Sequence, residues 1–224
     1  MAWDPVWEEV FTQQQWGKYP GEDLIRFIAR NFYRSPNRQE VKLLEVGCGP
    51  GANLWYMARE GFTVYGIDGS ETAVKQAKLR LDEECPGWRG EIRVGDILNL
   101  PYPDHFFDAV IDNEAIYSNS LQNSIQIYQE LARVTKVGGK LFSRTFATGC
   151  WGDGTGEKVG HRAYLVDEGP LHQKGYTRFT AYEEIPELIK GFSITEVQLL
   201  SKKIMMDPSE QDVREWIIFG EKKN

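Results

Sequence analysis

Short apolar segments alternate with longer amphipathic segments through the middle of the chain. Five apolar runs predict strands, at residues 42–46, 62–67, 91–95, 107–112 and 139–146. Between them, helices are predicted at residues 52–60, 70–84 and 121–135. Apolar strands separated by helices are typical of a parallel sheet that is covered on both faces. The pattern therefore predicts an α/β fold.

The two ends of the chain depart from this alternation. Residues 1–40 contain several aromatic side chains and an apolar pattern of helical spacing, which together predict a helical leader. Near the other end, a helix is predicted at about residues 180–190, followed by strands at 193–201 and 213–220. A short connection containing residues 206–208 joins these two strands, so we expect them to pair antiparallel at the end of the sheet.

A glycine-rich span at residues 147–175 separates the fifth predicted strand from the C-terminal elements. Loops of this length in compact domains usually carry function, so this span is the expected substrate loop. The chain length fits a single domain. Its expected parts are a helical leader and lid at 1–40, a ligand-binding core at 41–146, the substrate loop at 147–178, and a terminal helix and strand pair at 179–224.

Composition and charge narrow the classes of function. Hydrophobic residues at 41% and charged residues at 26% are ordinary for a globular protein, and no segment approaches the roughly 20 apolar residues that a membrane span needs. The acidic, aromatic N-terminus lacks the regions of an export signal, so we expect a cytoplasmic protein without membrane partners. A formal net charge of -7 argues against a nucleic-acid partner.

The cysteines and histidines predict neither disulfides nor a metal site. Cys48, Cys85 and Cys150 are widely spaced and form no CxxC pair, so we expect three free thiols. The three histidines are far apart in the sequence, and no paired carboxylates flank one of them at the spacing of metal ligands. Metal-dependent chemistry is therefore not expected.

The segment LLEVGCGPG at residues 43–51 follows the first predicted strand and precedes a helix. It therefore lies at the carboxyl edge of the sheet, where open α/β folds bind ligands. Its three glycines permit a close approach between the backbone and a ligand. The pattern from Gly47 to Ala52 also fits the dinucleotide motif with alanine at its third position, so a nicotinamide cofactor stays an alternative.

Three acidic residues come at the ends of neighbouring predicted strands. Glu45 lies beside the glycine loop, where its carboxylate would repel a pyrophosphate and suit a cationic group. Asp68 ends the second strand, at a position from which an acid can bind both ribose hydroxyls. Asp96 follows the third strand and could accept from an adenine amine, while the Ile97 N–H bonds a ring nitrogen. These acids indicate a nucleoside ligand with a positive tail.

Four motifs in order resemble the class I S-adenosylmethionine-dependent methyltransferases. They are LLEVGCGPG (43–51), YGIDGS (65–70), GDILNLPYPDHFFDAVID (95–112) and KVGGKLF (136–142). The resemblance covers roughly residues 41–146, and 192–221 match the family's last two strands. It implies a Rossmann-like, seven-stranded, mostly parallel sheet with helices on both faces and an antiparallel last strand. It also implies S-adenosylmethionine as the cofactor, which has a sulfonium and an ammonium group but no phosphate.

The family pattern implies a cofactor site built from the strand ends. It puts the glycine loop and Glu45 around the methionyl end, Asp68 on the ribose and Asp96 at the adenine edge. WGKYPGE at residues 16–22 resembles a leader segment that closes over the cofactor in some members. The complete expected set is Glu45, Gly47, Gly49, Gly51, Asp68, Gly69, Ser70, Asp96, Ile97, Asn113, Trp16 and Tyr19.

The residues that bind the methyl acceptor are harder to predict, because methyl transfer mainly needs aligned reactants and the exclusion of water. For a hydroxyl acceptor, His161 is the first choice of general base, and Asp112 or Tyr117 is the second. The expected substrate residues are Tyr117, Trp151, Tyr176 and Arg178. DNA- and RNA-modifying members often carry an Asn/Asp-Pro-Pro-aromatic motif after strand four, and the sequence here, residues 112–115, differs. We therefore expect methyl transfer to an oxygen or nitrogen atom of a small molecule.

Two other functions stay open at this point. One is a nicotinamide-dependent oxidoreductase that uses the same glycine loop, against which Glu45, Asp96 and the terminal antiparallel strands argue. The other is a non-catalytic protein that binds S-adenosylmethionine as a regulatory ligand.

Overall fold

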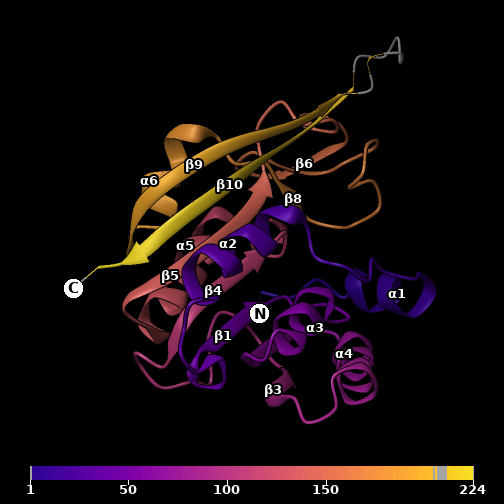
Figure 1. Ribbon diagram of the computed structural model, residues 1–224. Coiled ribbons are helices and arrows are strands. Elements are labelled where there is room, and N and C mark those ends of the chain that lie inside the picture. Colours follow the sequence, from indigo (N-terminus) through magenta and orange to yellow (C-terminus); the bar gives the residue numbers. More distant parts are fainter. Residues whose placement is uncertain (1, 204, 206–210, 224) are drawn as a thin grey trace.

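A computed structural model describes residues 2–203, 205 and 211–223 of the chain (Figure 1). In this described part, seven strands form one sheet in the order β3-β2-β1-β4-β5-β10-β9. The strands are β1 (Lys42–Val46), β2 (Thr63–Asp68), β3 (Arg89–Val94), β4 (Phe107–Asn113), β5 (Thr135–Phe146), β9 (Phe192–Lys203) and β10 (Asp212–Lys222). Strands β1 to β5 pair in parallel, whereas β10 pairs antiparallel with both β5 and β9. The predicted α/β fold is confirmed.

Helices cover both faces of this sheet. One layer consists of α2 (Glu22–Phe32), α3 (Ala52–Arg59) and α4 (Glu71–Glu84), and the other of α5 (Leu121–Val134) and α6 (Ile185–Leu188). Successive strand residues point to opposite faces, so Leu43 packs in the first layer and Leu44 in the second. Because both neighbours are apolar and fully buried, this part of β1 does not alternate between apolar and polar residues.

The predicted leader folds into two helices, and the first of them lies at the edge of the molecule. Helix α1 (Val6–Gln13) contacts α4, as the lower right of Figure 1 shows. The Glu8 carboxylate accepts hydrogen bonds from Ser70 Oγ and Thr72 Oγ1, both at 2.5 Å. These donors stand at the start of α4, directly after β2. The leader is therefore fastened to the carboxyl edge of the sheet.

Part of the predicted substrate loop is folded into short strands. Within it, β6 (Glu157–Gly160), β7 (Ala163–Leu165) and β8 (Thr177–Arg178) form a separate three-stranded antiparallel sheet among the described residues. No strand was predicted in this span, because short strands between glycines show no clear alternation.

Two other elements differ from the predictions. Strand β5 begins at Thr135 instead of residue 139, with a register shift opposite the start of β4. The helix expected at 180–190 is reduced to a 3-10 turn, Tyr182–Glu184, followed by the four-residue α6. The predicted connection at residues 206–208 lies outside the described residues. Over the described ranges, no helix has the length and apolar character to cross a membrane.

Candidate active site

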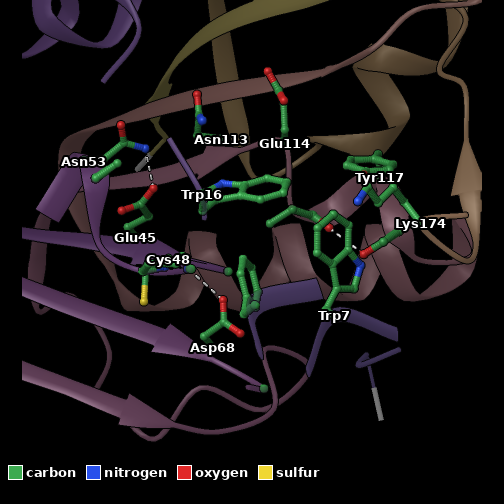
Figure 2. A pocket seen from close by; sticks show the side chains of 18 of the residues that line it. Trp7, Trp16, Glu45, Cys48, Asn53, Asp68, Asn113, Glu114, Tyr117 and Lys174 are labelled. Atoms are coloured by element: carbon green, nitrogen blue, oxygen red, sulfur yellow. Dashed lines mark hydrogen bonds between the residues drawn. The ribbon is translucent and has the colours of Figure 1, made fainter. Parts of the chain in front are cut away.

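A cavity of about 300 Å³ opens at the carboxyl edge of the sheet. The ends of β1, β2 and β4 form its floor, and residues from the leader and the substrate loop form its roof. Figure 2 shows Trp16 in the centre of this view, with Glu45 and Asp68 on one side and Tyr117 and Lys174 on the other. Its place agrees with the general position of ligands in open α/β sheets.

The glycine loop after β1 gives the cavity a close-approaching backbone. Gly47 has φ +61°, and a Cβ at this position would lie 2.2 Å from the Ala115 Cβ. Gly49 has φ +50° and donates its N–H to Asp68 Oδ2 at 2.8 Å. Both line the cavity as expected. Gly51 does not, since it begins α3 with φ +82° and allows close packing on Ala77 of α4.

Glu45 is buried, and only one of its two carboxyl oxygens has a hydrogen-bond partner in the described structure. Its Oε1 accepts from Asn53 Nδ2 at 2.5 Å, and Oε2 has no partner within the described part of the chain (Figure 2). The side chain is almost completely buried. Burial raises the pKa of Glu45 to about 8, against the opposing effect of the Asn53 hydrogen bond. A cation in the cavity would supply the missing partner.

Asp68 holds the glycine loop against the end of β2. Its carboxylate accepts from the backbone N–H of Gly49 at 2.8 Å and of Ser70 at 2.9 Å. Burial raises the pKa of Asp68, and these hydrogen bonds oppose the shift. Asp68 lines the cavity, but Ser70 lies behind it as the buried N-cap of α4, bonded to the Ala73 N–H. The expected contact of Ser70 with the ligand is thus replaced by a structural role.

The far end of the cavity combines two predicted residues with one that the sequence analysis missed. Gly69 and Ile97 line the cavity, as does Trp3 of the leader. The Trp3 ring packs on Gly69 so closely that a Cβ there would lie 2.2 Å from it. Asp96 lies behind this lining and accepts from the backbone N–H of Ala2 at 3.1 Å. No periodicity or motif in the sequence links Trp3 to this edge.

Aromatic side chains form the roof. Trp16 and Tyr19 line the cavity as predicted, together with Trp7 and Phe11. The Trp16 ring meets the Trp7 and Phe11 rings edge-on, with centroids 5.7 and 5.5 Å apart. Tyr19 is 72% exposed, at the outer rim. These contacts between rings make a largely apolar cover over the glycine loop.

Of the predicted residues at and after the end of β4, some line the cavity and one is buried in the core. Asn113 and Tyr117 line the cavity, and Tyr117 packs edge-on against Phe146 with ring centroids 4.9 Å apart. Burial raises the pKa of Tyr117, so its phenol stays protonated and forms a wall. Asp112 is fully buried and bonded, which corrects its proposed role as a base.

Four expected acceptor-side residues lie outside the cavity. His161 is at the surface with a side chain 56% exposed, and its Nε2 lies 2.5 Å from Glu184 Oε1. The turn between β6 and β7 directs it away, so its expected role as a base is corrected. Arg178 is buried and bonds Thr180 and Ser124. Trp151 and Tyr176 pack within the substrate loop, against Gly169 and Gly160.

Several lining residues had no signal in the sequence analysis. Glu114 and Lys174 line the cavity with charged side chains, and Pro170 and Leu171 bring the substrate loop over it.

All three cysteines are free thiols, as predicted. Within the described ranges, no three or more His, Cys, Asp or Glu side chains gather closely enough to hold a metal ion.

Comparison with known proteins identifies the relatives of this chain. Residues 44–143 match a family model described as a methyltransferase domain. A norajmaline N-methyltransferase from Rauvolfia serpentina is 30% identical over 56% of this chain and 42% of its own length. A sterol 24-C-methyltransferase from Gibberella zeae is 34% identical over 53% of this chain and 32% of its own length. The matched part of this chain thus spans less than half the length of either curated relative.

The fold is shared more widely than the sequence. A structure solved in a study of the conversion of a disulfide bond into a thioacetal group during echinomycin biosynthesis has a TM-score of 0.71. The match covers 98% of this chain and 91% of the other at 17% identity. At this identity, the likeness shows that the two chains have the same fold.

Proposed function

We propose that the chain contains a class I S-adenosylmethionine-dependent methyltransferase domain, supported by the methyltransferase family model that matches residues 44–143, and that it transfers a methyl group to an oxygen or nitrogen atom of a small molecule. The observation that carries this proposal is the buried Glu45 carboxylate beside the glycine loop, with Oε2 unpaired in the described structure. A buried carboxylate in that state favours a cationic ligand over a phosphate.

The residues of the cavity fit the cofactor that the family implies. Glu45 would bind the methionyl ammonium group, and Asp68 would bind the ribose hydroxyls. Gly69, Ile97 and Trp3 would surround the adenine ring. When bound, S-adenosylmethionine supplies a methyl group on a positively charged sulfur atom.

The aromatic roof gives the chain its own contribution to the reaction. Trp7, Trp16, Tyr117 and Phe146 all line the cavity and can hold an acceptor while they exclude water. Holding two reactants in the reactive orientation removes much of the entropic part of the barrier to a displacement reaction. The likeness to an N-methyltransferase supports a nitrogen acceptor, whereas the sterol relative methylates carbon according to its name.

The test of this proposal is turnover of methyl-labelled S-adenosylmethionine with a panel of small amines and alcohols. We expect label in at least one acceptor and formation of S-adenosylhomocysteine. Binding of S-adenosylhomocysteine without turnover of any acceptor would favour a non-catalytic binding protein. Thermal stabilisation by NADH, and not by S-adenosylhomocysteine, would favour the oxidoreductase.

Cofactor binding should release a proton from Glu45. With its pKa at about 8, the free carboxyl group holds a proton at pH 7, and the cofactor's ammonium group favours the charged form. Affinity for S-adenosylhomocysteine should therefore rise with pH up to about 8 and level off above it. Calorimetric titrations in buffers of different ionisation enthalpy measure the released proton. The Glu45→Gln variant should bind more weakly and release less; equal proton release from both proteins would exclude Glu45 as the source.

A further inference from the structure

A second acidic residue lines the cavity, and in Figure 2 its carboxylate points away from Trp16. Glu114 follows directly after β4, beside Asn113, and lines the cavity (Figure 2). Its side chain keeps 32% of its surface accessible. In the proposed mode of cofactor binding, Asp68 binds the ribose and Glu45 the methionyl end, which leaves Glu114 available to an acceptor. Glu114 therefore lies where an acceptor would enter.

Glu114 shares its cationic partner with another acid. Arg144 Nε lies 2.9 Å from Glu114 Oε1. Glu215 binds the same guanidinium with both oxygens, to Nε at 2.9 Å and to Nη2 at 2.6 Å. Bidentate pairs of this kind are the stronger ones, so Arg144 is largely neutralised by Glu215. The three side chains together carry one excess negative charge when both acids are ionised.

The backbone at Glu114 is held in a conformation that residues other than glycine rarely adopt. Its φ is +60°, and its N–H donates to the Arg144 carbonyl oxygen at 2.9 Å. Conformations of this kind persist when the surrounding structure imposes them and cluster at functional sites. This backbone conformation brings Glu114 to the wall of the cavity, with its carboxylate beside Arg144.

The walls around Glu114 suit a cation. Among the described residues, seven aromatic side chains line the cavity, and ring faces attract ammonium groups. The lining aromatic residues that lie toward the acceptor side are Trp7, Trp16, Tyr117 and Phe146. Of the charged side chains that line the cavity in the described part of the chain, four are carboxylates and one is a lysine: Asp4, Glu45, Asp68, Glu114 and Lys174.

We infer that the methyl acceptor is an amine, and that Glu114 binds its ammonium form and accepts its proton. This inference rests on the proposed methyl transfer and narrows it to nitrogen. In the proton transfer, the N–H bond breaks and its electron pair stays on nitrogen, while a new O–H bond forms on the Glu114 carboxylate. The nitrogen then holds the lone pair that methylation requires.

The protonation of Glu114 agrees with this role. Burial, together with a hydrogen bond to Glu215, raises the pKa of Glu114, and Arg144 opposes the shift. Lys202 of β9 acts in the same direction as Arg144, while Asp23 of α2 acts on Arg144. A carboxyl group with a raised pKa keeps its proton to higher pH, and an entering ammonium group would displace that proton. Activity is therefore expected to fall as the pH is lowered.

The experiment compares two cofactor analogues and needs no knowledge of the acceptor. Sinefungin carries a primary amine on carbon in place of the sulfonium methyl group, whereas S-adenosylhomocysteine has an uncharged sulfur there. Calorimetry at pH 7 should show that the protein binds sinefungin at least about tenfold more tightly, the scale of one hydrogen bond between charged groups. Sinefungin should also release about one proton more than S-adenosylhomocysteine, since Glu45 contributes equally to both titrations.

The Glu114→Gln variant keeps the shape of the side chain and should lose both the preference and the extra proton. Its affinity for S-adenosylhomocysteine should stay within about twofold of the wild type. The matched control is Glu221→Gln on β10, whose carboxylate pairs with Lys140 outside the cavity and should leave both measurements unchanged. Melting curves of both variants report whether they fold.

The outcomes separate this inference from the function on which it rests. If the wild type does not bind S-adenosylhomocysteine at all, the proposed methyl transfer fails, and the inference fails with it. If it binds but Glu114→Gln keeps the wild-type preference for sinefungin, only the assignment of Glu114 is overturned. Turnover of alcohols without turnover of amines in the acceptor panel would also overturn it.

Discussion

Replacing Asp68 with alanine should weaken the binding of S-adenosylhomocysteine about 100-fold, or about 2.7 kcal/mol. The carboxylate is expected to accept hydrogen bonds from the ribose, and the loss of one such bond to a charged group costs about 1.5–3 kcal/mol. It also holds the Gly49 N–H at 2.8 Å, so its loss loosens the glycine loop as well. Isothermal titration calorimetry measures the change directly.

A matched control distinguishes the loss of this contact from the loss of a surface charge. Asp104 has a side chain 64% exposed and pairs with Arg133 away from the cavity. Asp104→Ala should therefore bind S-adenosylhomocysteine as the wild type does. If folded Asp68→Ala protein kept the wild-type affinity, Asp68 would not be the ribose ligand.

Replacing Asp112 with alanine should lower the free energy of unfolding by about 3–5 kcal/mol. The side chain is completely buried and accepts four hydrogen bonds. The donors are the N–H groups of Ala115 at 3.1 Å and Ile116 at 3.0 Å, and the hydroxyls of Tyr128 and Ser143, both at 2.8 Å. Removal of the carboxylate leaves buried donors without a partner. Chemical denaturation measures the change.

Asparagine at the same position separates hydrogen bonding from volume. Asp112→Asn retains one acceptor oxygen and nearly the same shape, so it should cost about half as much as alanine. Equal loss in the two variants would mean that the negative charge matters more than the number of acceptors. A wild-type unfolding midpoint for Asp112→Ala would contradict the structural role assigned here.

The part of the cavity proposed to bind the cofactor was predictable, because its residues lie at fixed positions relative to strand ends. Gly47 follows β1 directly, and Asp68 is the last residue of β2. Where the periodicity locates a strand, the residues after it must lie at the carboxyl edge, since all neighbouring strands run parallel. The exceptions were Gly51, Ser70 and Asp96. Gly51 and Ser70 serve the starts of α3 and α4, and Asp96 lies behind the lining, where it accepts from the Ala2 N–H.

The acceptor half was not predictable in the same way. Residue type alone pointed to His161 and Trp151, but neither lines the cavity. His161 lies in the turn between β6 and β7, and Trp151 packs against Gly169. Glu114 shows the reverse case, because its importance depends on Arg144 and Glu215, which arrive from β5 and β10. Contacts between residues so far apart in the sequence leave no local pattern.

By itself, the sequence determined the layers of the fold, the direction of the strands and the chemistry at the ends of β1 and β2. Hydrophobic periodicity and turn residues act over a few positions, so they can be recognised without coordinates. Only the tertiary structure decided what covers the cavity: Trp3 on Gly69, the aromatic roof and the carboxylate of Glu114 above its shared arginine. These arrangements follow from the packing of distant segments, in which each side chain takes the space that its neighbours leave.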